Sequence, residues 1–237
     1  MSTNYQLVNT NKNELVKLIQ NNDLTGFEKL LDNLIDTDYS QVCYTVGSYF
    51  NNLDSNNDNE FISALYNNIK KMNNPSDIIV VSAAHIARVD LIEFLIDIGG
   101  NINAVDKDGF TPLSSACCFG NYNVVEFLIK NGANINNDKK SDIFKYLCYG
   151  QEKICSLLLD HGLIVDLNNK NEINGIFHII KSGNVSFLNL LLSHGVDLSP
   201  INKCLKNKYE NDKNNKIIDI LIDHDINPKY IHCMYVF

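Results

Sequence analysis

The chain has 237 residues, of which 45% are apolar, and its formal net charge at pH 7 is −8. This apolar share excludes wholesale disorder, and the acidic balance argues against a nucleic-acid partner because phosphate backbones repel an acidic surface. Seven irregularly spaced cysteines without a CxxC motif favour reduced thiols, the usual state inside cells.

The sequence carries no targeting signal that we can identify. Residues 1–14 lack the apolar stretch of a signal peptide, and no apolar run reaches the roughly 18 residues that cross a bilayer. We therefore expect a cytoplasmic or nuclear protein, monomeric and without membrane contact. The chain holds 36 asparagines and a single arginine, Arg88, a bias that indicates an AT-rich genome.

The N-terminal third is expected to be helical. Residues 13–34 predict two short helices joined by a turn at Asn22-Asp23, and residues 40–72 favour another helical pair around the loop Asp54–Asn59. We expect residues 1–75 to form degenerate repeats or a helical cap.

A repeated pattern begins near residue 76. Each copy is an aliphatic run followed two residues later by glycine, and the copies are spaced by 33, 30, 33 and 30 residues. The pattern ends at Gly99, Gly132, Gly162, Gly195 and Asp225, and a second glycine lies 12 residues before three of these, at Gly120, Gly150 and Gly183. The predicted units are 76–105, 106–138, 139–168, 169–200 and 201–231, followed by a short tail, 232–237.

The unit at 106–138 shows most clearly what one copy folds into. Asp108-Gly109 is typical of a turn, Thr111 of a helix N-cap, and Pro112 of a first helical position. A helix of about seven residues should end at Gly120. An apolar second helix should then end at Gly132, before an extended piece at 134–136.

One such unit cannot bury its own apolar faces, so neighbouring units must stack. The pattern therefore predicts an all-α solenoid of helix-turn-helix units joined by short extended or hairpin loops.

Residues 101–137 resemble the ankyrin repeat through the DxDGxTPL opening, the G-N turn, the VVxxLIxxGAxIN second helix and a period of about 33. The Asn/Ile/Lys-rich style is similar to that of ankyrin proteins encoded by large DNA viruses and by amoebae. A viral origin would place the protein in a host cell. Ser114 stands where the family prefers histidine.

The other units have lost the TPL triplet. Ser141 and Asn174 keep a capping side chain in its place, whereas Ile78 and Cys204 do not. We therefore expect the terminal units to melt before residues 106–200.

The resemblance implies a protein partner, bound through the turn tips and first helices that form a concave groove. The candidate tip residues are Asp106, Lys107, Asp108, Phe110, Asn137, Asp138, Lys139, Lys140, Asn169, Lys170, Asn171 and Glu172. The first-helix candidates are Ser115, Cys118, Phe119, Lys145, Tyr149 and Lys181. Aromatic residues often dominate interface energies, so loss of binding on Phe119→Ala or on charge reversal at Lys139 would support this interpretation.

The histidines and cysteines do not form a metal-binding pattern. His161, His194 and His224 occur once per repeat, and packed helices are roughly 8–10 Å apart, so the three cannot converge on one ion. We interpret them as last-turn residues that meet free helix carbonyls. Cys117, Cys118, Cys148 and Cys155 are interpreted as core residues, and no cofactor is expected.

The leading hypothesis is a non-enzymatic scaffold or adaptor. The alternatives are an enzyme or redox-active protein with a Cys/His site, which predicts an alkylation-reactive thiol, and a purely structural spacer.

Overall fold

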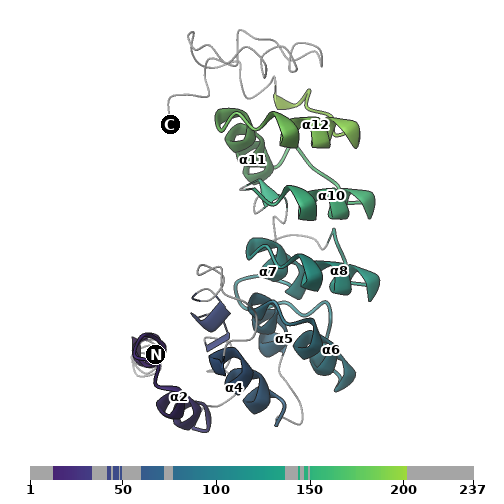
Figure 1. Cartoon of the computed structure of the whole chain (residues 1–237). Helices are drawn as coiled ribbons and strands as arrows, with labels where there is room; N and C mark the ends of the chain where they lie inside the picture. The colour runs from purple at the N-terminus through teal and green to yellow at the C-terminus, as the bar shows by residue number, and fades with distance from the viewer. Residues whose placement is uncertain are drawn as a thin grey trace. The chain divides into compact units, whose positions relative to one another are not determined.

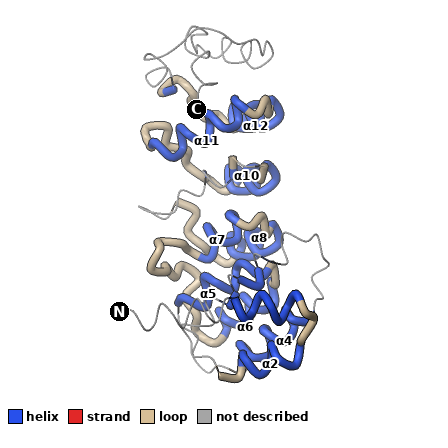
Figure 2. The backbone as a smooth tube through the Cα atoms, turned by 90° about the vertical axis from the view of Figure 1, so that its left-hand side faces the viewer, coloured by secondary structure: helices blue, strands red, loops and turns tan. Residues whose placement is uncertain are grey.

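A computed structural model describes residues 13–33, 42–43, 45–47, 49, 60–71, 77–136, 144, 147–148 and 150–201. Contacts divide the chain into two compact units, Met1–Ser141 and Asp142–Phe237. Both consist of helices and loops, and no strand occurs in the ranges just given (Figure 2).

The helices follow one another in chain order (Figure 1). In the first unit they are a helix at 13–20, α2 (Leu24–Leu31), α4 (Glu60–Ile69), α5 (Asp77–Ala83), the short 3-10 helix η1 (Ala84–Ile86), α6 (Val89–Asp97), α7 (Pro112–Cys118) and α8 (Tyr122–Lys130). In the second unit they are α10 (Glu152–Asp160), α11 (Lys170–Lys181) and α12 (Val185–Ser193).

The pair α7 and α8 confirms the predicted repeat. Thr111 caps α7: its side chain accepts from the Ser114 N–H, while the Ser114 hydroxyl accepts from the Thr111 N–H. Pro112 is the first helical residue, so its missing N–H costs nothing. The serine that replaces the family's histidine therefore completes a capping box.

Left-handed residues end the helices where glycine was expected. Gly120, Gly132, Gly150, Gly162, Gly183 and Gly195 all have positive φ angles, between 72° and 107°. The first helix of unit 76–105 lacks this glycine and ends instead at Ala87, with φ 58°. Ala87 lies 12 residues before Gly99, as Gly120 does before Gly132. An alanine therefore occupies a backbone conformation that glycine adopts more easily.

We expect Ala87→Gly to raise the free energy of unfolding by about 0.5–1 kcal/mol, because it removes the steric cost of the left-handed conformation. Urea denaturation followed by circular dichroism measures the change. Ala84→Gly is the matched control: Ala84 lies in η1 without positive φ, so this change should destabilise. Equal effects of the two substitutions would contradict the explanation.

The core of the first unit lies between the second helices and the helices that precede them. Leu91 and Leu95 of α6 and Val124 and Leu128 of α8 are fully buried. Asn121 adds a polar tie between repeats, because its side-chain amide donates to the Ala84 carbonyl over 2.6 Å. Within Met1–Ser141, the pair α5 and α6 thus packs on the pair α7 and α8, as a repeat stack requires.

The N-terminal residues also form helical pairs. The helix at 13–20 turns at Asn22 into α2, as the sequence predicted, and Asp23 caps α2. Phe27 of α2 packs edge-on against Phe61 of α4 with ring centroids 5.1 Å apart. The predicted loop 54–59 lies outside the described residues.

In the second unit, α11 begins earlier than expected. Asn169 is its N-cap and accepts from the Asn171 N–H, so the capping role predicted for Asn174 is wrong and Asn174 lies inside the helix. Asn184 caps α12 and donates to Glu152 of α10 over 2.7 Å.

The loops after the second helices are turns rather than the predicted extended piece. Residues 135–136 form a turn, and the Asn134 side chain accepts from the Asn136 N–H. The same contact between residues i and i+2 occurs at Asn101, Asp166 and Asp197. The Asn103 side chain also accepts from the Asn134 N–H, which joins consecutive repeats. Short polar side chains therefore set the loop geometry.

Candidate functional site

The tip of unit 106–138 is a turn organised by one carboxylate. The Asp106 side chain accepts from the N–H groups of Asp108 and Phe110, at 2.9 and 2.8 Å. Its backbone N–H donates to the Phe110 carbonyl, and its carbonyl accepts from Gly109, which has a φ of 88°. Four hydrogen bonds within five residues give this tip a defined shape without a partner.

The same tip presents both charge and apolar surface. Lys107 and Asp108 are exposed, and Asp106 and Phe110 are half-buried. The side chain of Val105 is 53% exposed, which makes it one of the few large apolar residues open to solvent among the described residues. Sequence reasoning did not select Val105, although a β-branched residue directly before a D-K-D-G turn was a usable signal.

Ser115 does not lie on an open surface. It is 0% exposed, and its hydroxyl lies 3.3 and 3.4 Å from the two ring nitrogens of His85. Because His85 Nδ1 also meets the Ser82 carbonyl at 2.9 Å, we assign the proton to Nδ1 and let the serine donate to Nε2. Ser115 therefore holds α7 against the preceding repeat, and its side chain cannot touch a partner.

Phe119 can offer only one face of its ring to a partner. Its ring packs on the His85 ring, with centroids 4.2 Å apart, and the side chain is half-buried. Desolvation lowers the pKa of His85 to about 4, although the Ser82 carbonyl and Asp106 oppose the shift. Phe119→Ala would therefore disturb an interface between repeats as well as a surface.

The remaining candidates are distributed unevenly. Cys118 is half-buried. Asn169, Lys170 and Asn171, predicted as a tip, form the N-cap and first turn of α11 instead. Seven candidates lie outside what the structure describes: Asn137, Asp138, Lys139, Lys140, Lys145, Tyr149 and the Lys181 side chain. Ser141, predicted as a capping residue, lies outside it as well.

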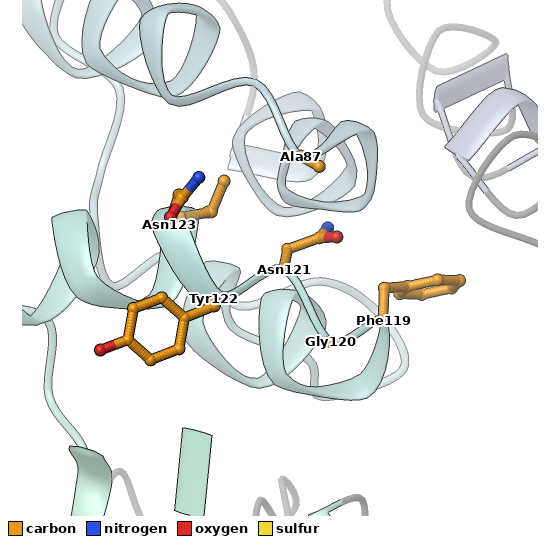
Figure 3. Close-up of a pocket in the computed structure, with 7 residues that line it drawn as sticks. Ala87, Phe119, Gly120, Asn121, Tyr122 and Asn123 are labelled. Atoms are coloured by element: carbon orange, nitrogen blue, oxygen red, sulfur yellow. The ribbon is translucent and has the colours of Figure 1, made fainter. Parts of the chain in front are cut away.

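A shallow hollow of about 360 Å³ lies beside the turn between α7 and α8 (Figure 3). Ala87 lines it together with residues 119–124. Asn121 is already engaged with Ala84, and no acid, base or nucleophile faces another across the hollow among the lining residues. The hollow is a surface feature with no catalytic arrangement of its own.

Two of the three last-turn histidines bind helix carbonyls as predicted, and the third, His224, lies outside the described residues. His161 Nδ1 lies 2.8 Å from the Leu157 carbonyl, and His194 Nδ1 lies 2.8 Å from that of Leu190. His194 Nε2 also meets Asp160 of α10 at 3.1 Å, and the Leu190 carbonyl and Asp160 raise the pKa of His194. In the described segments, no three His, Cys, Asp or Glu side chains gather in a way that could hold a metal ion.

Most described cysteines are buried free thiols, as the core interpretation predicted. Burial raises the pKa of Cys43 and of Cys155 to about 12, and it raises the pKa of Cys148 well above its usual range. A thiol, unlike a thiolate, is a poor nucleophile, so these three sulfurs are protected in the folded state.

Native alkylation should therefore follow burial. At pH 8 we expect iodoacetamide to modify Cys118 at least tenfold faster than Cys43, Cys117, Cys148 or Cys155, because only Cys118 is not buried in this set. Peptide mass spectrometry gives the rate at each site. Fast modification of Cys148 or Cys155 would instead favour a reactive thiol and the enzyme hypothesis.

Comparison with known proteins agrees with this architecture. Residues 53–139 match the family model for ankyrin repeats in three copies. The match begins upstream of residue 76, so the ankyrin likeness extends into the segment that was predicted to be degenerate. No curated protein matches the chain.

The helical pairs and the family match together define an all-α ankyrin-repeat fold. Ankyrin repeats generally mediate protein–protein interactions and are typically non-enzymatic. None of the helices in the described part of the chain has both the length and the hydropathy needed to cross a bilayer.

Proposed function

We propose that the chain is a non-enzymatic scaffold that binds a protein partner through the concave side of its ankyrin repeats. The tip at 105–110 carries the proposal, because Asp106 holds it in one shape while Val105, Lys107 and Asp108 point their surface to solvent. A preformed tip loses little conformational freedom on binding, which favours affinity.

Within Met1–Ser141, the proposed contact surface contains fewer residues than the sequence suggested. It consists of Val105, Lys107, Asp108, Phe110 and the outer face of Phe119, and it omits the buried Ser115. The sequence candidates that lie outside the described residues stay part of the proposal: Asn137, Asp138, Lys139, Lys140, Lys145 and Tyr149. We also propose that the array includes the five units given above, with repeat sequence upstream of residue 76 as the match at residues 53–139 suggests, and that the protein works as a monomer inside a cell.

Proximity labelling in the native cell, followed by pull-down with purified protein, tests the function. We expect a labelled protein to be lost when Val105→Ser and Lys107→Glu are combined, because both side chains are exposed and neither supports the core. Lys153→Glu is the charge-matched control, since Lys153 is exposed on α10. Recovery of the same proteins with both variants would contradict the proposed surface.

A further inference from the structure

Helices α4 and α6, both in the compact unit Met1–Ser141, each carry an aromatic ring that contacts the same lysine. The Lys70 ammonium lies 4.4 Å from the centroid of the Tyr66 ring on α4 and 5.5 Å from that of Phe94 on α6. Both rings are half-buried and Lys70 is exposed. Within the described residues no carboxylate lies in ion-pair range of Lys70, and the contacts that its head group makes there are with the two rings.

The Tyr66 ring is held by two further side chains. The Arg88 guanidinium lies 5.0 Å from the Tyr66 ring centroid and binds both oxygens of Asp90, at 3.1 and 3.0 Å. Tyr66 also hydrogen-bonds Asp90, and these contacts hold the pKa of Asp90 below its usual range. Arg88 therefore links Tyr66 to Asp90, whereas Lys70 is an exposed side chain that lies over the Tyr66 ring.

The surroundings favour a positive ligand. Helix α6 carries Asp90, Glu93 and Asp97 and contains no lysine or arginine. Glu93 and Asp97 are exposed, and the whole chain has a net charge of −8. Aromatic ring faces attract ammonium and guanidinium groups, and exposed carboxylates on the same helix as Phe94 add a negative field.

We propose that Tyr66 and Phe94 form a docking site for a lysine or arginine side chain of a basic peptide segment, and that Lys70 occupies this site when no partner is bound. The site lies on second helices, and it does not depend on the tip surface at 105–110. The exposed carboxylates repel an acidic peptide or a nucleic acid from the same place.

Removal of the internal occupant tests the proposal. The probe is a fluorescent twelve-residue peptide in which lysine and arginine alternate with glycine and serine, bound to the full-length protein at low salt and followed by anisotropy. We expect Lys70→Gln to tighten binding by about two- to fivefold, because a competing cation–π contact is lost. Lys130→Gln is matched in charge, since Lys130 lies at the end of α8 and pairs with Glu126, and it should have a smaller effect.

Removal of the rings should have the opposite result. Tyr66→Leu and Phe94→Leu keep apolar bulk and should weaken binding at least threefold, whereas Phe127→Leu on α8 should leave it unchanged. Circular dichroism verifies that each variant is folded. The proposal is overturned if the peptide does not bind, if Lys70→Gln equals Lys130→Gln or weakens binding, or if the ring variants bind normally. The Val105→Ser/Lys107→Glu variant should bind the peptide normally, which separates this site from the proposed tip function.

Discussion

Replacement of Gly175 by alanine is expected to lower the free energy of unfolding by about 1–2 kcal/mol, although alanine is the better helix former. Gly175 lies in the middle of α11 and is buried. A Cβ atom there would lie 2.5 Å from the Cys148 sulfur and 3.3 Å from the Cys148 Cβ. Cys148 cannot easily move away, since it is buried and its S–H donates to the Phe144 carbonyl.

Two effects compete at this position, and a double-mutant cycle separates them. Helix propensity alone would make Gly175→Ala stabilising by about 1 kcal/mol. When Cys148→Ala removes the sulfur, the substitution should therefore become neutral or stabilising. Urea denaturation measures both steps. Asn174→Ala, at an exposed position of the same helix, is the control and should not destabilise. A loss of the same size with and without the sulfur would contradict this packing.

Lowering the pH from 7.5 to 5 is expected to cost the wild-type chain about 2 kcal/mol of stability through His85 alone. Burial lowers the pKa of His85 from 6.5 to about 4 in the folded state. Between these values the unfolded chain takes up a proton that the folded chain does not. Stability is therefore complete above pH 6.5 and falls as the pH drops toward 4.

The variant His85→Gln isolates this contribution. Glutamine does not titrate, and it can still donate to the Ser82 carbonyl. The stability difference between wild type and variant should shrink by about 2 kcal/mol between pH 7.5 and 5. Titration of His194, whose pKa is raised instead, is common to both proteins and cancels. A difference that stays constant with pH would show that His85 titrates normally.

Local signals predicted the fold well where they were physically complete. Thr111, Pro112 and Gly120 set a helix from its cap to its end, and each of these features is confirmed. The left-handed conformation of Ala87 was not predicted, since alanine carries no local turn signal. The early start of α11 was also missed, because Asn169 and Asn174 are both acceptable caps and only packing selects between them.

The candidate surface was less predictable than the fold. The repeat pattern placed Ser115 on the first helix, but it did not reveal the contact with His85, which lies 30 residues away. The ring pair of Tyr66 and Phe94 was missed for the same reason, since it joins helices in two different repeats. Contacts across a repeat interface depend on side-chain direction, and a single sequence does not encode that in any local pattern.

The central claim is that neighbouring helical pairs stabilise one another, and native-state hydrogen exchange of the full chain tests it most directly. Within Met1–Ser141 the pair α5 and α6 has helices on both sides, since α6 meets Lys70 at the end of α4 and also packs on α8, so its amides should be far better protected than those of the helix at 13–20 and α2. Equal protection from residue 13 to residue 193 would contradict a stack held together by its nearest neighbours.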